Sequence, residues 1–345
     1  MTASTRPAGP PGNTDRLAAW AVSRMASAAA EDARVDAVVD IEYADRYAEA
    51  NLGGRFAARA QGGGPAHRHP TGRQSFRLGG VSPLRLREQD VDAPWAALLD
   101  PARLIRGIGT VTYSRRHRHW IELHITPHRL FARPTDPWLP PGAGALVVHL
   151  DPDTGFLRSA VLLDEHGPLA TAKVGSLCVE NVRSGGEAGG VLARMAATLL
   201  EPARLTAMVR LETDLHDDLS FASVPSGRSW RISSSLGPLT VTGEYEPDRT
   251  SPVAARLAEL LTPARIVSHL AQVTATSPTS VEATVRPLRT FPFSAWAPDE
   301  NLTCRLTVDP ATGVLVRAEA ATGQRPVFRH SVTALGADCR RQHGN

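Results

Sequence analysis

The sequence predicts a mainly β protein of the α+β class, built from two tandem curved antiparallel sheets, or half-barrels. Two observations carry this prediction. Short segments of alternating apolar and polar residues recur between turn residues, which is typical of antiparallel strands. In addition, residues 21–42 and 191–212 align with each other without a gap. Identical pairs in this alignment include Arg24/Arg194, Met25/Met195, Glu31/Glu201, Arg34/Arg204 and Glu42/Glu212. A repeat of this length is normally a whole domain.

Length and composition fit two globular domains. The chain has 345 residues, 42% of them hydrophobic, so each half is long enough to bury its own core. Aromatic residues are only 5%, which argues against a nucleic-acid binder that stacks bases on aromatic side chains. The 38 basic and 35 acidic residues leave a net charge of +3, too balanced to imply a polyanionic partner. We therefore expect no nucleic-acid partner.

The first copy begins with a helix and a strand. Residues 1–13 are rich in Pro and Gly and are predicted to form a disordered tail. Thr14 or Asp15 would cap a helix that continues to about residue 30. Residues 35–42 then alternate in the manner of a strand with one buried face. Further strands are predicted near 74–78 and 84–87, after a Gly- and Arg-rich loop at 45–70.

Helical segments interrupt the strands in the middle of the first copy. Residues 93–108 predict two short helices that meet at Asp100-Pro101, where the pair reads as an N-cap and a first helical residue. Five more strands are predicted at 110–113, 120–125, 146–150, 156–163 and 169–174. The turn 151–155 contains Gly155 where a positive φ is expected. This order predicts an antiparallel meander joined by hairpins.

The second copy repeats the same order. A Gly-rich linker at 184–190 is predicted to separate a first domain, 14–183, from a second domain, 191–340. A helix at 190–201 leads into a strand at 204–212. Residues 260–267 match 98–105, and the turn 309–313 matches 151–155.

The short helices in each copy predict a ligand cavity. Because they cannot extend a sheet, we expect them to lie across its concave face as a lid. A curved sheet closed by helices leaves an apolar cavity unless large side chains fill it. The predicted cavity and lid residues are Trp95, Leu98, Leu99, Leu104, Ile105, Leu257, Leu260, Leu261, Ile266 and Val267.

The order of elements resembles a known family. Residues 306–317, LTVDPATGVLVR, follow the pattern LxVDPxTGxLxR of a closing hairpin, which comes after a helix, a strand and a helical insertion. In this order the chain resembles the lipoprotein-carrier superfamily, which includes LolA, the RseB sensor domains and the LppX/LprG lipid carriers. The resemblance implies a half-barrel whose helical lid holds acyl chains without catalysis. This chain departs from the family by lacking its export signal and by carrying two copies.

No sequence motif predicts catalysis, a cofactor or a metal. GxSxG, P-loop, HExxH and GxGxxG patterns are all missing from the sequence. Cys178, Cys304 and Cys339 lack paired spacing, which indicates reduced thiols rather than disulfides or a zinc site. His117 and His119 would share one strand face. Their spacing is compatible with a metal site and with an ordinary basic surface, and the basic surface is preferred.

A second set of polar residues is interpreted as structural. Glu122 and Glu282 occupy matching positions of the two copies, so a shared ion pair, with Arg103 or Arg265, is the preferred interpretation. No run of about 18 apolar residues predicts a membrane span, and the N-terminal residues lack the apolar segment of a secretory signal. We therefore expect a cytoplasmic protein.

Three functional hypotheses remain at this point. The preferred one is a non-enzymatic protein that binds a lipid, an acyl chain or another hydrophobic small molecule. The second is a structural or regulatory module with fully packed domains, which binds a protein partner in the groove between them. The third is a barrel-type enzyme, which would place ionisable groups such as Glu122, His124 or Asp40 inside a cavity.

Overall fold

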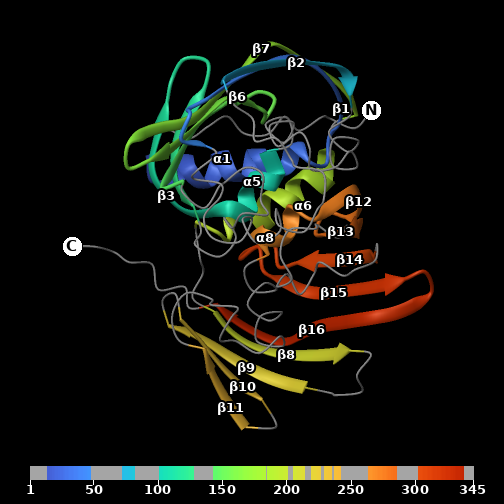
Figure 1. Cartoon of the computed structure of the whole chain (residues 1–345). Helices are drawn as coiled ribbons and strands as arrows, with labels where there is room; N and C mark the ends of the chain where they lie inside the picture. The colour runs from blue at the N-terminus through green and yellow to red at the C-terminus, as the bar shows by residue number, and fades with distance from the viewer. Residues whose placement is uncertain are drawn as a thin grey trace, which may run out of the picture.

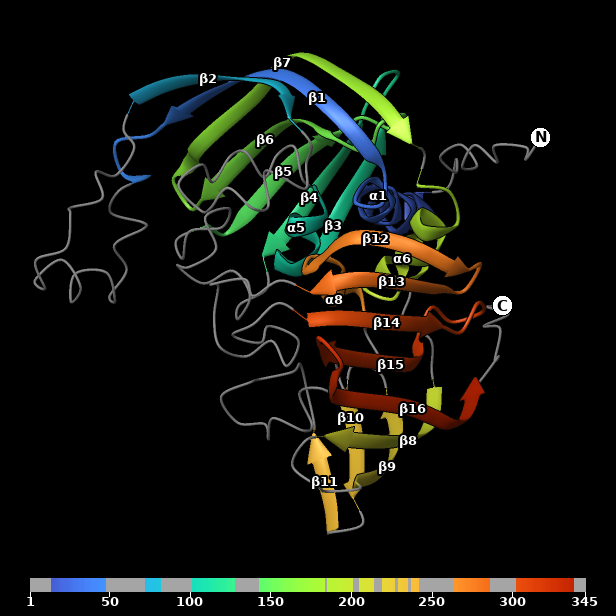
Figure 2. The ribbon, with the colours of Figure 1, turned by 90° about the vertical axis from the view of Figure 1, so that its right-hand side faces the viewer.

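The computed structural model describes residues 14–47, 72–81, 101–127, 143–183, 185–200, 205–213, 219–226, 229–234, 237–241, 263–285 and 302–337. In these residues the protein is mainly β and of the α+β class, as predicted. Two antiparallel sheets lie on either side of a layer of helices (Figure 1, Figure 2). We call the sheet formed by the N-terminal half sheet 1 and the other sheet 2.

Sheet 1 has seven strands in the order β2-β1-β7-β6-β5-β4-β3. Its strands are β1 (Asp32–Tyr43), β2 (Gly72–Val81), β3 (Ile108–Arg116), β4 (Ile121–Pro127), β5 (Ala145–Leu150), β6 (Leu157–Asp164) and β7 (Gly167–Arg183). Strand β7 is much longer than the predicted 169–174, because its second half continues along β1. Ser176, at φ +51°, lies in the bulge that allows this. The strand predicted near 84–87 lies outside the described residues.

Sheet 2 has nine strands in the order β11-β10-β9-β8-β16-β15-β14-β13-β12. Its strands are β8 (Leu205–Thr213), β9 (Leu219–Ser226), β10 (Ser229–Ser234), β11 (Gly237–Val241), β12 (Leu270–Ser277), β13 (Ser280–Val285), β14 (Leu302–Val308), β15 (Leu315–Thr322) and β16 (Arg325–Ala337). The run β8-β16-β15-β14-β13-β12 has the same neighbours as β1-β7-β6-β5-β4-β3 in sheet 1. The two sheets therefore share one strand topology over six strands.

Four helices of the described chain fill the space between the sheets. They are α1 (Thr14–Ala28), α5 (Pro101–Gly107), α6 (Gly186–Ala197) and α8 (Ala264–Val267). Helix α1 packs against α6, and α5 packs against α8, so that matching helices of the two halves meet (Figure 2). In α1 the spacing of Leu17, Ala21 and Met25 puts all three on one buried face. The buried residues of both halves form one continuous apolar core.

The predicted linker is partly helical. Residues 186–190 form the first turns of α6, which begins earlier than the predicted residue 190. The glycines have a packing role. A Cβ on Gly185 would lie 3.3 Å from the Cβ of Ala30, and one on Gly189 would lie 3.3 Å from the Cβ of Ser27. Two glycines four positions apart thus allow the backbone of α6 to approach α1 closely.

The turns 151–155 and 309–313 adopt one structure in both sheets. In each, the amide of the glycine donates to the carbonyl of the aspartate, at 2.8 Å for Gly155 and 2.9 Å for Gly313. The φ angles of these glycines are +76° and +74°, as the sequence predicts for a left-handed position. Each glycine also lies against a helix. A Cβ on Gly155 would be 2.8 Å from the carbonyl oxygen of Arg24, and one on Gly313 would overlap that of Arg194.

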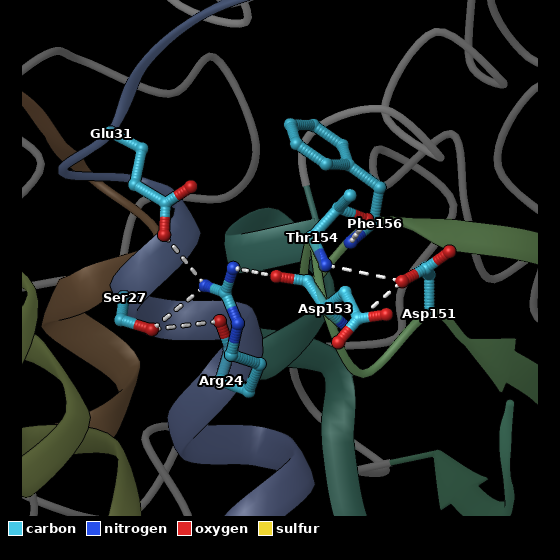
Figure 3. A network of polar contacts seen from close by, with 7 residues as sticks. All are labelled: Arg24, Ser27, Glu31, Asp151, Asp153, Thr154 and Phe156. Carbon is cyan, nitrogen blue, oxygen red and sulfur yellow. Dashed lines mark hydrogen bonds and ion pairs between the residues drawn. The ribbon is translucent and has the colours of Figure 1, made fainter. Parts of the chain in front are cut away.

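Arg24 joins α1 to the first of these turns (Figure 3). Its guanidinium donates to Glu31 at 2.8 Å, to the hydroxyl of Ser27 at 3.2 Å and to the carbonyl oxygen of Asp153 at 2.7 Å. The Asp151 carboxylate in turn accepts the amides of residues 153 and 154. The side chain of Arg24 is only 5% exposed. A buried cation therefore fixes the turn to the helix.

Arg194, which the sequence alignment pairs with Arg24, also ties its helix to a turn. Its guanidinium donates to the carbonyl oxygen of Pro278, between β12 and β13. Each arginine thus attaches its helix to a connection between two strands, although the partners differ. Both also occupy the helix position against which a turn glycine packs.

Candidate functional site

The predicted lid residues that the structure describes lie in the core. Leu104 and Ile105 on α5, and Ile266 and Val267 on α8, are each no more than 1% exposed. Because α5 contacts α8, these side chains lie where the two halves of the protein meet. The other predicted cavity and lid residues lie outside the described residues; they are Trp95, Leu98, Leu99, Leu257, Leu260 and Leu261.

A buried polar contact accompanies this apolar junction. Arg106 and His269 are 4% and 3% exposed, and Nη1 of Arg106 lies 3.2 Å from Nε2 of His269. Since arginine only donates, Nε2 of His269 is the acceptor, which makes this imidazole neutral. Arg265 donates to the carbonyl oxygens of Arg106 and Ile108, at 2.6 and 3.3 Å. These hydrogen bonds connect α8 with α5. No pattern in the sequence marks them, because their partners are far apart along the chain.

The outer face of sheet 1 carries a group of ionisable side chains that we call the Glu122 cluster: Glu122, His117, His124 and His149. Nε2 of His124 lies 2.7 Å from Oε1 of Glu122, and Nε2 of His117 lies 3.0 Å from Oε2. Nε2 of His149 is 4.0 Å from the same Oε2. The register of the sheet brings them together, because Glu122 on β4 lies opposite His149 on β5.

Hydrogen bonds and partial burial set the protonation of the Glu122 cluster. The hydrogen bond from His124 is the largest cause that lowers the pKa of Glu122, and partial burial opposes it. Burial lowers the pKa of His149, and the charge of Glu122 opposes that shift. The hydroxyl of Ser159 lies 2.8 Å from Nδ1 of His149 and fixes the orientation of its ring. Glu122 is thus held as a carboxylate among imidazoles.

Aromatic rings frame the same cluster. Trp120 stacks on His117 with 5.0 Å between ring centroids and lies 5.7 Å from His149 in a tilted arrangement. Tyr113 meets His124 edge to face at 4.9 Å. Tyr113 is 42% exposed and presents its ring to solvent. The face therefore combines flat aromatic surface with titratable nitrogen atoms.

The geometry of this cluster does not favour catalysis or metal binding. Ser159 and His149 resemble a nucleophile and its base, but 4.0 Å separates His149 from Glu122, beyond hydrogen-bond distance. Ser159 also lies on β6, an interior strand of the sheet. Because the backbone of β6 is hydrogen-bonded to strands on both sides, its amides are not available to stabilise an oxyanion beside Ser159. Among the described residues, no group of three or more His, Cys, Asp or Glu side chains is arranged to hold a metal ion. The imidazoles point at the carboxylate itself.

The matching position of sheet 2 has a different environment. Glu282 faces Arg305 at 3.7 Å, and both side chains are about half exposed. Beside them, Glu319 pairs with Arg317 at 2.7 Å and with Arg329 at 3.1 Å. The sequence-based expectation that Glu122 and Glu282 share one kind of ion pair, with Arg103 or Arg265, is therefore wrong. Both glutamates lie on outer sheet faces, where the partners are imidazoles in sheet 1 and arginines in sheet 2.

Only part of the Glu122 cluster is evident from the sequence. The spacing of His117 and His119 predicts a pair on one strand face, whereas His119 lies exposed at the hairpin and His117 contacts Glu122. His149 was missed because its proximity to Glu122 depends on the register between β4 and β5. The alternation of β5, which buries Leu146, Val148 and Leu150, is the signal that places His149 on the outer face.

Comparisons with known proteins found no sequence match and only remote structural similarity. No family model matches the chain, and no curated protein matches it. Solved structures similar to it include the MucA/MucB complex of Pseudomonas aeruginosa, with 12% identity, a TM-score of 0.25, and coverage of 91% of this chain and 93% of that one. Another is MucB, with 15% identity, a TM-score of 0.25, and coverage of 64% and 80%. A third is MucB in complex with MucA(peri), with 11% identity, a TM-score of 0.24, and coverage of 91% and 93%.

TM-scores of this size carry no inference about function. Separately, none of the helices in the described residues is both long and apolar enough to cross a membrane.

Proposed function

We propose that the protein is a non-enzymatic binding protein that holds a lipid, an acyl chain or another apolar ligand on the inner face of one or both sheets. The supporting observation is the continuous apolar inner face of each sheet. In sheet 1, Ile121, Leu123 and Ile125 of β4 are buried toward the helices. In sheet 2, the same alternation buries Val281 and Val285 of β13. Such faces can bind an apolar ligand by the hydrophobic effect alone, with no reaction involved.

Small residues on the central strands support this proposal. Ala160 on β6 and Ala318 on β15 occupy matching inner-face positions, opposite Val148 and Leu306. Both alanines are fully buried, so a ligand would reach them by displacing the elements that cover the sheet, and their short side chains would leave it more depth than leucine or valine. An acyl chain that buried about 300 Å² there would gain roughly 7 kcal/mol from the hydrophobic effect, in the range of micromolar affinity.

We further propose that the chain consists of two LolA/LppX-like domains, 14–183 and 191–340, which arose by tandem duplication. The shared six-strand topology and the two matching turns packed on Arg24 and Arg194 support this division. The helical start of α6 reduces the linker to the residues before it. In this arrangement the predicted lid residues would contribute to two sites, one in each half.

Native mass spectrometry of the purified protein tests the proposed function, combined with solvent extraction and displacement of a fluorescent fatty acid. We expect an extra mass in the lipid range, with one or two ligands per chain. The matched variants Ala160→Leu and Ala318→Leu narrow one inner face each, so the variant that lowers occupancy identifies the working sheet. Circular dichroism confirms that both variants fold. A ligand-free mass together with no probe displacement would refute the proposal.

A protein-interaction module is the second candidate, and one observation favours it. The helices of both halves already cover each other in a continuous core, and Leu104, Ile105, Ile266 and Val267 are buried in it. A rigid core of this kind would support binding on the outer sheet faces. If the extraction yields no ligand, a protein partner becomes the preferred function.

A further inference from the structure

The β3–β4 hairpin concentrates positive charge on sheet 1. Arg115 and Arg118 are exposed, and Arg116 and His119 lie beside them on the same hairpin. From β3 through β5, the described residues contain a single carboxylate, that of Glu122. The next acids along the described chain lie in the turn after β5. One of them, Asp151, is neutralised by Arg158 at 2.5 Å, and the other, Asp153, is exposed.

The one carboxylate in this region does not cancel the surrounding charge. Glu122 is 22% exposed and lies under the imidazoles of His117 and His124, which occupy its two oxygen atoms. An approaching anionic group would therefore meet guanidinium and imidazole groups before it met this carboxylate. Trp120 and the exposed ring of Tyr113 add apolar contact area at the same place. Cations with interspersed aromatic rings are suited to an acidic partner.

We propose that the outer face of sheet 1 around the β3–β4 hairpin is a docking surface for an acidic segment of a protein partner, and that binding strengthens as the pH falls. The fold itself does not require such charge. In sheet 2, the matching hairpin between β12 and β13 has no charged residue, and the glutamates of the outer face are paired with arginines. The surface is thus a property of sheet 1 alone, and it does not depend on the apolar ligand proposed above.

The position of β3 favours a protein segment over a lipid headgroup. In the described residues β3 is the terminal strand of sheet 1, so its outer edge has no neighbouring strand. Helix α1 packs against β3, but the residues from Thr112 to Arg116 are mostly exposed. An extended acidic segment could add to this edge through backbone hydrogen bonds, with its carboxylates near Arg115 and Arg118.

The histidines make this surface sensitive to pH. An imidazole that gains a proton adds positive charge to the face, and histidine is the side chain suited to do so near neutral pH. On β6, Arg158 is paired with Asp151 and adds no net charge. The groups around Glu122 are Tyr113 and Arg115 from β3, His117, Arg118 and His119 from the hairpin, His124 from β4, His149 from β5 and Ser159 from β6. All the charged ones except Glu122 are basic. We expect the affinity to rise about tenfold between pH 7.5 and pH 5.5.

Fluorescence anisotropy with a labelled Asp-rich peptide of 12 residues tests the proposal, since aspartate stays ionised at both pH values. The control peptide carries Asn in place of Asp. We expect the Asp-rich peptide alone to bind, with lower affinity at 300 mM than at 50 mM NaCl. Arg115→Gln combined with Arg118→Gln should weaken binding at least fivefold. The matched pair Arg305→Gln and Arg317→Gln on sheet 2 should leave it unchanged.

A second comparison separates the role of the histidines. His117→Gln combined with His124→Gln should at least halve the gain in affinity between pH 7.5 and pH 5.5 and retain binding at pH 7.5, since His119 and His149 remain. Thermal unfolding of each variant checks its folding. The proposal is overturned if the peptide does not bind, if the sheet 2 variants weaken binding as much as the sheet 1 variants, or if the histidine variant keeps the full pH dependence. Binding to vesicles with 30% phosphatidylserine without binding to the peptide would also overturn it, in favour of a membrane surface.

Discussion

Gly313→Ala probes the contact between a hairpin turn and helix α6. Gly313 has a φ of +74°, and a Cβ at this position would overlap the carbonyl oxygen of Arg194 and lie 3.0 Å from Cγ2 of Thr198. The chain provides a matched control in Gly323, whose φ is +60° but whose Cβ would meet nothing within 4 Å. Alanine at either position must adopt a left-handed backbone. Only Gly313→Ala must also separate the turn from the helix.

The difference between these two variants can be estimated. A left-handed conformation costs a non-glycine residue about 1–2 kcal/mol, which applies to both variants. Overpacking a close contact adds about 1–3 kcal/mol, which applies to Gly313→Ala alone. We therefore expect a loss of about 1 kcal/mol for Gly323→Ala and about 3 kcal/mol for Gly313→Ala. Gly155→Ala should resemble the latter, because its Cβ would lie 2.8 Å from the carbonyl oxygen of Arg24.

Urea unfolding at 25 °C, followed by tryptophan fluorescence, measures these losses. The midpoint should fall for each variant while the dependence of the free energy on urea stays constant, since that dependence reflects the surface exposed on unfolding. Equal free energies of unfolding for Gly313→Ala and Gly323→Ala would show that the turn does not press on α6, and would contradict the packing described above.

Three other predictions concern buried groups. Arg24→Met should lower the free energy of unfolding by about 3 kcal/mol, measured in the same way, because it leaves the carboxylate of Glu31, which is 12% exposed, without its cation. Burial lowers the pKa of His330 to about 4 from 6.5. The unfolded chain therefore takes up this proton first, and stability that is complete above about pH 6.5 is lost toward pH 4. Between pH 7 and pH 5, His330 should lower the free energy of unfolding by about 2 kcal/mol. His330→Ala should lack this contribution, so its free energy of unfolding should fall less with pH than that of the wild type. Burial raises the pKa of Cys304 to about 12, whereas Cys178 is exposed, so peptide mapping after maleimide treatment of the native protein should find label on Cys178 long before Cys304.

The elements that local patterns determine could be predicted from the sequence. Strand β4 buries Ile121, Leu123 and Ile125 and leaves the residues between them partly exposed, which is the alternation that the sequence displays. The turn glycines at 155 and 313 were predicted for the same reason, since their positive φ follows from the turn type. Local patterns were sufficient there because the energetic preference acts over a few residues.

Features that depend on tertiary packing could not be predicted. Gly185 and Gly189 were interpreted as a linker because glycine-rich segments are usually flexible, and their use in the contact between α1 and α6 depends on a neighbour far away in the sequence. The extension of β7 required a bulge at Ser176 that no local signal marks. The Glu122 cluster required the register between β4 and β5, which fixes His149 beside Glu122.

The packing of α1 on α6 and of α5 on α8 has a consequence for assembly. Because matching helices meet, each half of the chain presents the surface that is complementary to its own counterpart. Two chains could therefore exchange halves and rebuild the same buried contacts between molecules. The connection just before Gly186 is short, so it keeps the halves of one chain at an effective concentration in the millimolar range. We expect a closed monomer below that concentration, with exchanged dimers favoured when the protein is concentrated during refolding.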